Sequence, residues 1–152
     1  MQISAFTDYS LRVLIYAAAH DGRVCTVEEI ASAFAISRHH LVKVVNQLGR
    51  LGYLDTRRGR GGGFTLACVA GDTRLGEVVR RVEGNLALVE CFDRGTNACP
   101  LARGCGVKSA LREAFDAFFA VLDRYTLADM VAQPRWAATL VSLLPLAKSR
   151  HA

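Results

Sequence analysis

The sequence predicts a mainly α-helical protein with one small β-hairpin, in which a winged helix-turn-helix domain is followed by a long dimerisation helix. Three observations predict this class. Apolar residues recur at helical spacing along most of the chain. Two short helices joined by a brief turn, the second with a basic outer face, are typical of a helix-turn-helix. A turn rich in glycine and arginine then separates two short strand candidates and predicts the wing.

The first helix is expected over Thr7–His20. Leu11 and Leu14 belong to an apolar face at helical spacing, Thr7 can serve as the N-cap, and Gly22 follows the expected end. Asp8 falls in the first turn, where an acidic side chain is favoured by the helix dipole and can pair with Arg12 four residues later.

The second and third helices form the expected helix-turn-helix. Thr26 followed by Glu29 fits a capping box at the start of the second helix. Ser37 can cap the third helix, whose inward face has apolar residues at helical spacing: Leu41, Val44, Val45, Leu48 and Leu51. Its outward face is therefore the predicted recognition surface.

The wing is expected from two strand candidates, Tyr53–Arg57 and Phe64–Ala67, with a basic, glycine-rich tip between them. Glycines allow close approach to a phosphate and arginines supply charge, whereas the alternative is an ordinary surface turn. Arginines at this tip suit the minor groove, and histidine or lysine in the third helix suits the major groove.

Basic residues are concentrated in these two elements. The 152-residue chain has a net charge of +5 and a pI of about 9.2, and residues 38–60 contain six basic residues against one acidic residue. This distribution favours double-stranded DNA as the partner. The candidate DNA contacts are Arg12, Ser37, His39, His40, Lys43, Arg58, Arg60 and Gly61.

The second half of the chain predicts a connecting helix over Asp72–Glu83, ended by Gly84, and a long helix over 107–125. The long helix has a wide apolar stripe, which either packs within one subunit or forms a two-fold dimer interface through Leu111, Phe115, Phe118 and Leu122. A capping box at Thr126 and Asp129 and an apolar segment over 136–146 follow. The expected units are 1–70, 71–90, 91–106, 107–131 and 132–152.

Cysteines provide the candidate metal site. Cys91, Cys99 and Cys105 fall within fifteen residues, with no fourth cysteine or histidine beside them, while Cys25 and Cys68 are expected to be small buried residues. Three thiolates and a weaker donor favour a metal cofactor that stays reactive; a thiol–disulfide switch and structural zinc are the alternatives.

The sequence also predicts the cellular location of the protein and argues against an enzyme. It shows no secretory leader and no membrane span, so a cytoplasmic protein without a membrane partner is expected. A chain of this length is not a multidomain enzyme, and it shows no nucleotide-binding loop or acid–base pair. No catalytic residue is therefore predicted.

Together the motifs resemble the nitric-oxide-sensing NsrR group of the Rrf-type family of winged-helix regulators, which also contains IscR. The resemblance runs from Phe6-Thr7-Asp8-Tyr9, through the wing at 57–63 and Cys99-Pro100 with Cys105, to the residues 125–129. It implies a homodimer that represses genes from a two-fold symmetric DNA operator and senses nitric oxide through an iron–sulphur cluster.

The resemblance also implies a ligand set. It assigns the cluster to Cys91, Cys99 and Cys105, and it implies Asp8 of the partner subunit as the fourth ligand of a 4Fe-4S cluster, which is favoured over 2Fe-2S. The histidine that completes the IscR-like set is missing from residues 106–109 of this chain. Glu90 and Asp93 are rival oxygen donors, and sensing of redox state or of cluster supply is the alternative function.

Overall fold

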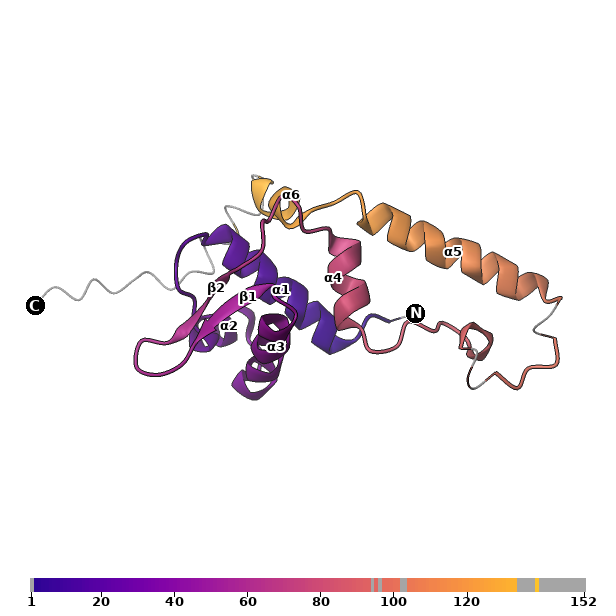
Figure 1. Ribbon diagram of the computed structural model, residues 1–152, viewed down its shortest axis with the longest axis horizontal. Coiled ribbons are helices and arrows are strands. Elements are labelled where there is room, and N and C mark those ends of the chain that lie inside the picture. The colour runs from indigo at the N-terminus through magenta and orange to yellow at the C-terminus, as the bar shows by residue number, and fades with distance from the viewer. Residues whose placement is uncertain (1, 94, 96, 102–103, 134–138, 140–152) are drawn as a thin grey trace, which may run out of the picture.

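The computed structural model describes residues 2–93, 95, 97–101, 104–133 and 139. Its element order confirms the mainly α-helical class with one hairpin (Figure 1). The elements are α1 (Ala5–Ala19), α2 (Val27–Phe34), α3 (Arg38–Arg50), β1 (Leu54–Arg57), β2 (Gly63–Leu66), α4 (Leu75–Val82), the 3-10 turn η1 (Glu90–Phe92), α5 (Gly106–Leu122) and α6 (Leu127–Ala132).

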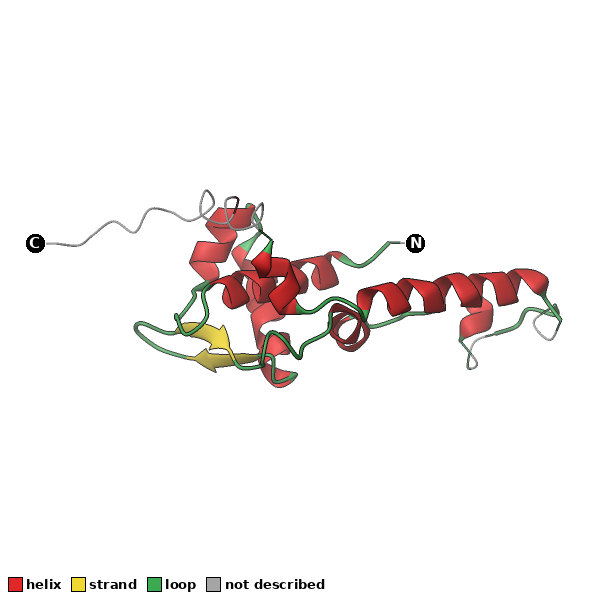
Figure 2. Ribbon diagram, turned by 90° about the horizontal axis from the view of Figure 1, so that it is seen from above, coloured by secondary structure: helices red, strands yellow, loops and turns green. Residues whose placement is uncertain are grey.

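The elements form a compact head and a projecting arm. Helices α1–α3 and the hairpin make up the head, and α5 extends away from it on the other side of α4 in two perpendicular views (Figures 1 and 2). The described residues between Cys91 and Cys105 (91–93, 95, 97–101 and 104–105), here called the cysteine loop, lie at the arm end of the molecule, opposite the hairpin. The fold therefore separates the expected DNA-reading surface from the cysteines.

Helix α1 begins earlier than expected because Ser4, not Thr7, is its N-cap. The Ser4 hydroxyl accepts a hydrogen bond from the Thr7 backbone N–H, and Thr7 itself is buried inside the first turn. Further along, Val13, Leu14 and Tyr16 are buried in the core of the head. The helix packs against α3 and α6, so it is the central element of the head.

The helix-turn-helix follows the prediction closely. Thr26 and Glu29 form the expected capping box, and Ala35 ends α2 in the left-handed region with φ of 52°. Ser37 occupies the N-cap position of α3, but its side chain makes no capping hydrogen bond, which corrects the expected role of its hydroxyl. The inward stripe is buried at Leu41, Val44, Val45 and Leu48.

The hairpin is antiparallel, with Leu54 opposite Leu66 and Arg57 opposite Gly63, and each strand begins one residue away from its expected start. Phe64 exchanges backbone hydrogen bonds of 2.8 Å with Cys25 in both directions. The α1–α2 connection therefore adds a short third strand segment to the wing. This bridge fixes the root of the wing against the head.

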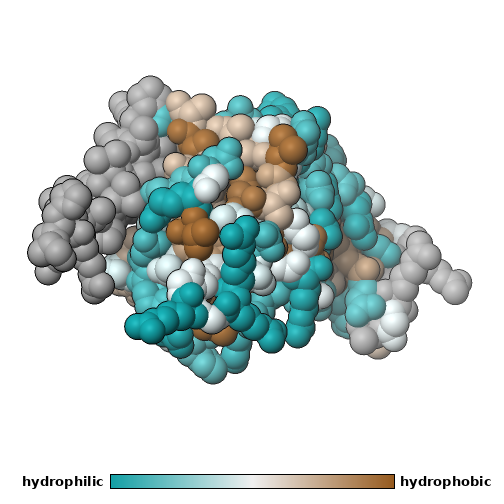
Figure 3. All heavy atoms as spheres, turned by 60° about the vertical axis from the view of Figure 1, so that its left-hand side comes forward, coloured by the Kyte–Doolittle hydropathy of each residue, from teal (hydrophilic) through white to brown (hydrophobic). Residues whose placement is uncertain are grey.

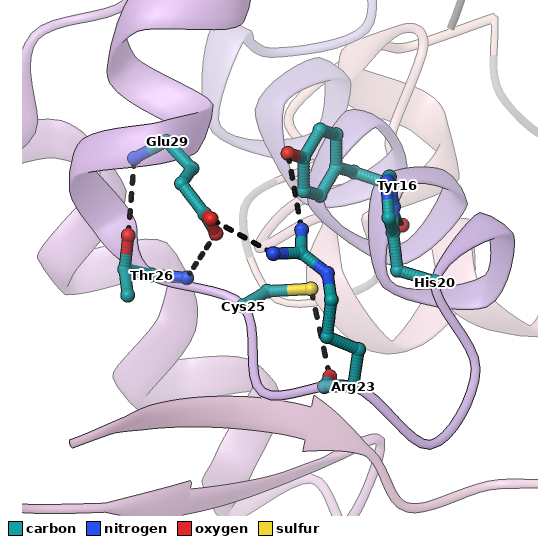
Figure 4. Close-up of polar contacts among 6 residues, drawn as sticks. All are labelled: Tyr16, His20, Arg23, Cys25, Thr26 and Glu29. Atoms are coloured by element: carbon teal, nitrogen blue, oxygen red, sulfur yellow. Dashed lines mark hydrogen bonds and ion pairs between the residues drawn. The ribbon is translucent and has the colours of Figure 1, made fainter. Parts of the chain in front are cut away.

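A polar cluster holds that connection in place (Figure 4). The Arg23 guanidinium pairs with Glu29 at 2.9 Å and donates to the Tyr16 hydroxyl at 3.5 Å. Cys25 lies beside this cluster and is fully buried, as expected, whereas Cys68 is only half-buried. Burial raises the pKa of the Cys25 thiol, so this side chain is a neutral packing group rather than a reactive thiolate.

Helix α4 joins the head to the arm and is shorter than expected, with Arg74 at its N-cap and Glu83 after its last residue. Glu83 has an extended backbone, so the helix ends there rather than through Gly84. In the last turn of α4, Arg80 makes a bidentate pair with Asp123 at 2.8 and 2.7 Å and lies 4.2 Å from the Phe119 ring centroid. These contacts attach α5 to α4.

The arm itself differs slightly from the prediction. Helix α5 starts at Gly106 and ends at Leu122, three residues short of the expected end, and α6 begins with the expected capping box of Thr126 and Asp129. Apart from Thr139, the apolar segment expected over 136–146 lies outside the described residues. In the part of the chain that the structure describes, no helix is long and apolar enough to cross a membrane.

Candidate nucleic-acid interface and cysteine loop

The expected major-groove side chains all lie on the exposed side of α3. Ser37, His39, His40 and Lys43 are exposed, while the opposite side of the helix is buried in the head. The surface at this end of the molecule is mainly hydrophilic (Figure 3). The helix therefore presents hydrogen-bond donors outward at the start of α3, where a recognition helix contacts bases.

The wing tip is exposed and shaped by glycine. Gly59 and Gly61 have φ values of 98° and 79°, in the region that favours glycine, and the exposed Arg58 and Arg60 alternate with them. Between α3 and the hairpin lies an open groove of about 450 Å³, lined in part by Arg38, Asn46, Thr56 and Arg57. The recognition helix and wing thus border one surface rather than two separate ones.

Three residues of this groove, Arg38, Asn46 and Arg57, were not among the expected DNA contacts. Helical spacing already placed the first two on the outer face of α3, so the sequence contained the signal. Arg38 is paired with Glu28 of α2 at 2.6 Å. Its hydrogen bond lowers the pKa of Glu28, and because both side chains are largely exposed, the pair can exchange for a phosphate contact at little cost.

Asp8 and Arg12 form the expected pair on α1. Their side chains meet at 2.7 Å and are 46% and 42% exposed, respectively. Arg12 also lies 6.0 Å from the ring centroid of Phe34 in α2. An ion pair this exposed contributes little stability, so the Asp8 carboxylate can change partner.

The cysteine loop contains the three candidate thiolates in different local settings. Cys91 is in η1, Cys99 precedes Pro100, and Cys105 is the N-cap residue of α5. All three are half-buried free thiols. Short polar contacts shape the loop: Glu90 accepts a hydrogen bond from the Ala98 N–H at 2.6 Å.

The subunit does not gather these donors into one site. Among the described residues, no three His, Cys, Asp or Glu side chains are placed to hold a metal ion together. Asp8 belongs to the head, whereas the cysteines belong to the arm end. The donor set, three accessible thiols in one loop with no neighbouring fourth thiol or imidazole, still has the chemistry of an iron–sulphur site that takes its last ligand from elsewhere.

The apolar stripe of α5 is divided between two surroundings. Phe115 contacts Phe92 of η1 edge to face at a centroid distance of 6.1 Å, and Phe118 contacts Phe119 at 5.2 Å. Phe119, which was absent from the expected interface, is the buried residue of α5. The expected interface residues Leu111, Phe115, Phe118 and Leu122 are all half-buried in the single subunit.

A contact between head and arm was not visible in the sequence. The Glu83 carboxylate accepts hydrogen bonds from the Ser4 N–H, the Ser4 hydroxyl and the Thr7 hydroxyl at 3.1, 3.0 and 2.6 Å. Burial acts to raise the pKa of Glu83, but these hydrogen bonds outweigh it and lower the pKa below the ordinary value of 4.5. Glu83 therefore fixes the start of α1 to the end of α4.

This contact predicts an acid-dependent loss of stability. Because the folded pKa of Glu83 is lowered, its contribution is complete above the ordinary value of 4.5 and disappears as the pH falls through the folded pKa. We expect Glu83→Gln to lower the free energy of unfolding by about 1 to 2 kcal/mol at pH 7 and by much less at pH 3. Thermal unfolding across this pH range, with exposed Glu113→Gln as the matched control, measures the difference. Equal losses at both pH values would contradict it.

The head, with a recognition helix and wing bordering one basic groove, defines the class of protein: a winged-helix transcription regulator with a helical arm. A family described as iron-dependent transcriptional regulators, Rrf2, matches residues 3–133. The chain belongs to the Rrf2 family.

Relatives and solved structures agree with this assignment. The chain is 48% identical to the HTH-type transcriptional regulator NsrR of Bacillus subtilis, over 86% of this chain and 90% of that protein. It is also 48% identical to NsrR of Geobacillus kaustophilus, over 95% and 97% of the two chains. The oxidized form of Staphylococcus aureus CymR matches with a TM-score of 0.69 at 26% identity, covering 88% and 98% of the chains, and T. potens IscR with 0.69 at 25%, covering 86% of each. The protein is thus an NsrR-like Rrf2 regulator.

Proposed function

We propose that the protein is a cytoplasmic, homodimeric repressor whose operator binding is controlled by an iron–sulphur cluster that senses nitric oxide. The observation that carries the proposal is the placement of three free, half-buried cysteines in one loop at the far end of an arm from a winged-helix head. Similarity to NsrR proteins and a family described as iron-dependent support the same function.

A second copy of the chain is the proposed partner of the arm. Helix α5 buries only Phe119 fully in the single subunit, and Val107, Val121 and Tyr125 near its two ends are 67%, 43% and 42% exposed. Apolar surface of this extent on a long helix is usually covered. A two-fold dimer would also present two recognition helices to a two-fold symmetric operator.

The proposed cluster is held by Cys91, Cys99 and Cys105, with Asp8 of the other subunit as fourth ligand. When bound, the cluster supplies iron that reacts with nitric oxide. A carboxylate is a weak ligand to such iron, and within the described residues of its own subunit the Asp8 carboxylate pairs with the half-exposed Arg12. A 4Fe-4S cluster, with three thiolates and one distinct iron, fits this donor set better than 2Fe-2S.

Coupling to DNA then follows from the position of Asp8. It lies in the first turn of α1, which packs directly against α3. While Asp8 is bound to the partner's arm, both heads are held to the dimer frame at a fixed separation. Release of Asp8 frees α1 and the recognition helix that packs on it, which weakens operator binding.

The first test is anaerobic purification with iron and sulphide analysis, followed by DNA binding before and after nitric oxide. We expect stoichiometric iron and sulphide, tight binding to a selected operator, and a loss of about 5- to 150-fold in affinity after nitric oxide. A metal-free protein with the same affinity under both conditions would reject the proposal.

Asp8→Ala tests the fourth ligand separately. We expect the variant to retain the cluster through three cysteines but to show an altered visible spectrum and a weaker operator affinity. Arg12→Ala is the matched control for the visible spectrum, because it removes the Asp8 ion pair while leaving the carboxylate. Its operator affinity is not compared, since Arg12 is itself a candidate DNA contact. An Asp8→Ala spectrum and nitric oxide response identical to wild type would return Asp8 to a role in helix capping.

A thiol–disulfide switch on the same fold is the second candidate. It is favoured by the three free thiols in one loop and by the likeness to a CymR structure described as an oxidized form. This mechanism needs no iron and predicts that peroxide, followed by a thiol reductant, reversibly changes operator binding in metal-free protein. Operator binding that requires iron and does not change with peroxide or a thiol reductant would exclude the thiol–disulfide switch.

A further inference from the structure

One aromatic contact joins the turn that carries Asp8 to the recognition helix. The ring of Tyr9, the next residue of α1, stacks on the imidazole of His40 in α3, with centroids 6.2 Å apart and planes inclined by 30°. The distance and the small angle fit an offset stack. His40 is the third residue of α3, among the side chains expected to enter the major groove.

The two partners differ in how firmly they are held. Tyr9 is half-buried and packs against the core of the head, so its ring is a fixed platform. His40 is exposed, and an exposed imidazole on a helix surface exchanges rotamers freely unless something holds it. His39 contacts the same imidazole at 6.1 Å with an inclination of 56°. The Tyr9 ring is therefore what orients His40 from outside its own helix.

We propose that Tyr9 is a positioning residue for DNA reading: it orients His40 toward the base edges and so sets operator specificity. The inference rests on the proposed function, because it takes α3 as the element that reads DNA. A hydrogen bond from an imidazole to a base edge is directional, so a pre-oriented ring discriminates between sequences. The positive charge of the wing arginines attracts DNA of any sequence, and this attraction does not depend on Tyr9.

The same contact gives the Asp8 turn a direct route to the reading surface. Arg12 pairs with Asp8 and lies against Phe34 of α2, while Tyr9 lies against His40 of α3. This turn therefore contacts both helices of the helix-turn-helix. Movement of Asp8 reaches His40 through one neighbouring residue and one ring contact, so loss of the cluster reduces specificity as well as affinity.

The experiment uses anaerobically purified, cluster-loaded protein and two DNA probes: a duplex of about 30 base pairs enriched from a random library by the wild type, and a scrambled duplex of equal composition. Fluorescence anisotropy gives both affinities for Tyr9→Leu, Tyr9→Phe, His40→Ala and the double variant Tyr9→Leu/His40→Ala. Tyr9→Phe is the matched control because it keeps the ring and removes only the hydroxyl.

We expect Tyr9→Leu and His40→Ala each to weaken binding to the enriched duplex by about three- to tenfold, and the double variant to be no weaker than His40→Ala. Tyr9→Phe stays within about twofold of wild type, and Tyr9→Leu binds the scrambled duplex as wild type does. Additive losses in the double variant, or wild-type affinity of Tyr9→Leu for the enriched duplex, would overturn the proposal.

A spectroscopic readout keeps the test independent of DNA affinity. The Tyr9 ring current shifts the proton resonances of the His40 imidazole, and this shift is expected to disappear in Tyr9→Leu and to remain in Tyr9→Phe. An unchanged imidazole spectrum in Tyr9→Leu overturns the stack itself. If the wild type enriches no sequence at all, the proposed function fails. If a sequence is enriched that depends on His40 but not on Tyr9, only the present inference fails.

Discussion

Replacement of Cys99 by alanine is expected to abolish the visible absorption of the anaerobically purified protein and to lower its operator affinity by about 5- to 150-fold. Cys99 supplies one of three thiolates in the proposed site, and two thiolates with one carboxylate do not retain a four-iron cluster. In the proposed dimer, loss of the cluster would leave Asp8 with its ion pair to Arg12, and the heads would no longer be held to the dimer frame. The affinity that remains should be insensitive to nitric oxide.

Cys68→Ala is the matched control for this experiment. Cys68 is a free, half-buried thiol like Cys99, but it lies in the head just after β2. The control variant should therefore keep its iron, its operator affinity and its loss of affinity on exposure to nitric oxide. Tight, nitric-oxide-sensitive binding by iron-free Cys99→Ala would show that the cluster does not control DNA binding.

Local signals in the sequence were sufficient to predict most of the head. The capping boxes at Thr26 and Thr126 each join residues three positions apart in the chain, and both are present in the structure. The apolar stripe of α3 is likewise a property of one helix, and its four central residues are buried as expected. Where a contact is formed by neighbours in the chain, spacing alone specifies it.

Contacts between distant segments were not predictable in this way. The hydrogen bonds from Ser4 and Thr7 to Glu83 cross 79 and 76 residues, and no pattern within one helix indicates them. The same limit applied to α5, where Phe118 and Phe119 are adjacent: spacing placed Phe118 on the apolar stripe, and it did not indicate that Phe119 is the residue buried within the subunit. Only the position of α4, with Arg80 against the ring, selects Phe119.

The candidate site shows this limit most clearly. The residues themselves supplied the three cysteines, because donor chemistry depends on residue identity, and the family resemblance supplied Asp8. The sequence could not supply their arrangement, since Asp8 lies in the first turn of α1 in the head and the cysteines lie at the end of the arm. Their proposed meeting depends on a second chain, and neither spacing nor the fold of one subunit specifies that chain's position.

Gly63→Ala is expected to destabilise the head by about 2 to 3 kcal/mol and to weaken binding to any DNA. A β-carbon at Gly63 would collide with the backbone carbonyl oxygen of Cys25 and come within 2.7 Å of a Val24 methyl group. The Cys25 carbonyl cannot move at low cost, because Cys25 is fully buried and exchanges two backbone hydrogen bonds with Phe64. The substitution therefore separates the wing from the α1–α2 connection and misplaces its arginines.

Gly71→Ala controls for the change from glycine to alanine itself. A β-carbon at Gly71 meets nothing within 4 Å. The free energy of unfolding of this variant should therefore lie within about 0.5 kcal/mol of the wild-type value. Urea unfolding of both variants, together with binding to a scrambled duplex, measures stability and wing function at once. Because the bridge to Cys25 positions the whole hairpin, Gly63→Ala should lose stability and affinity for the scrambled duplex together. A Gly63→Ala protein as stable as Gly71→Ala would show that the wing root can move without cost.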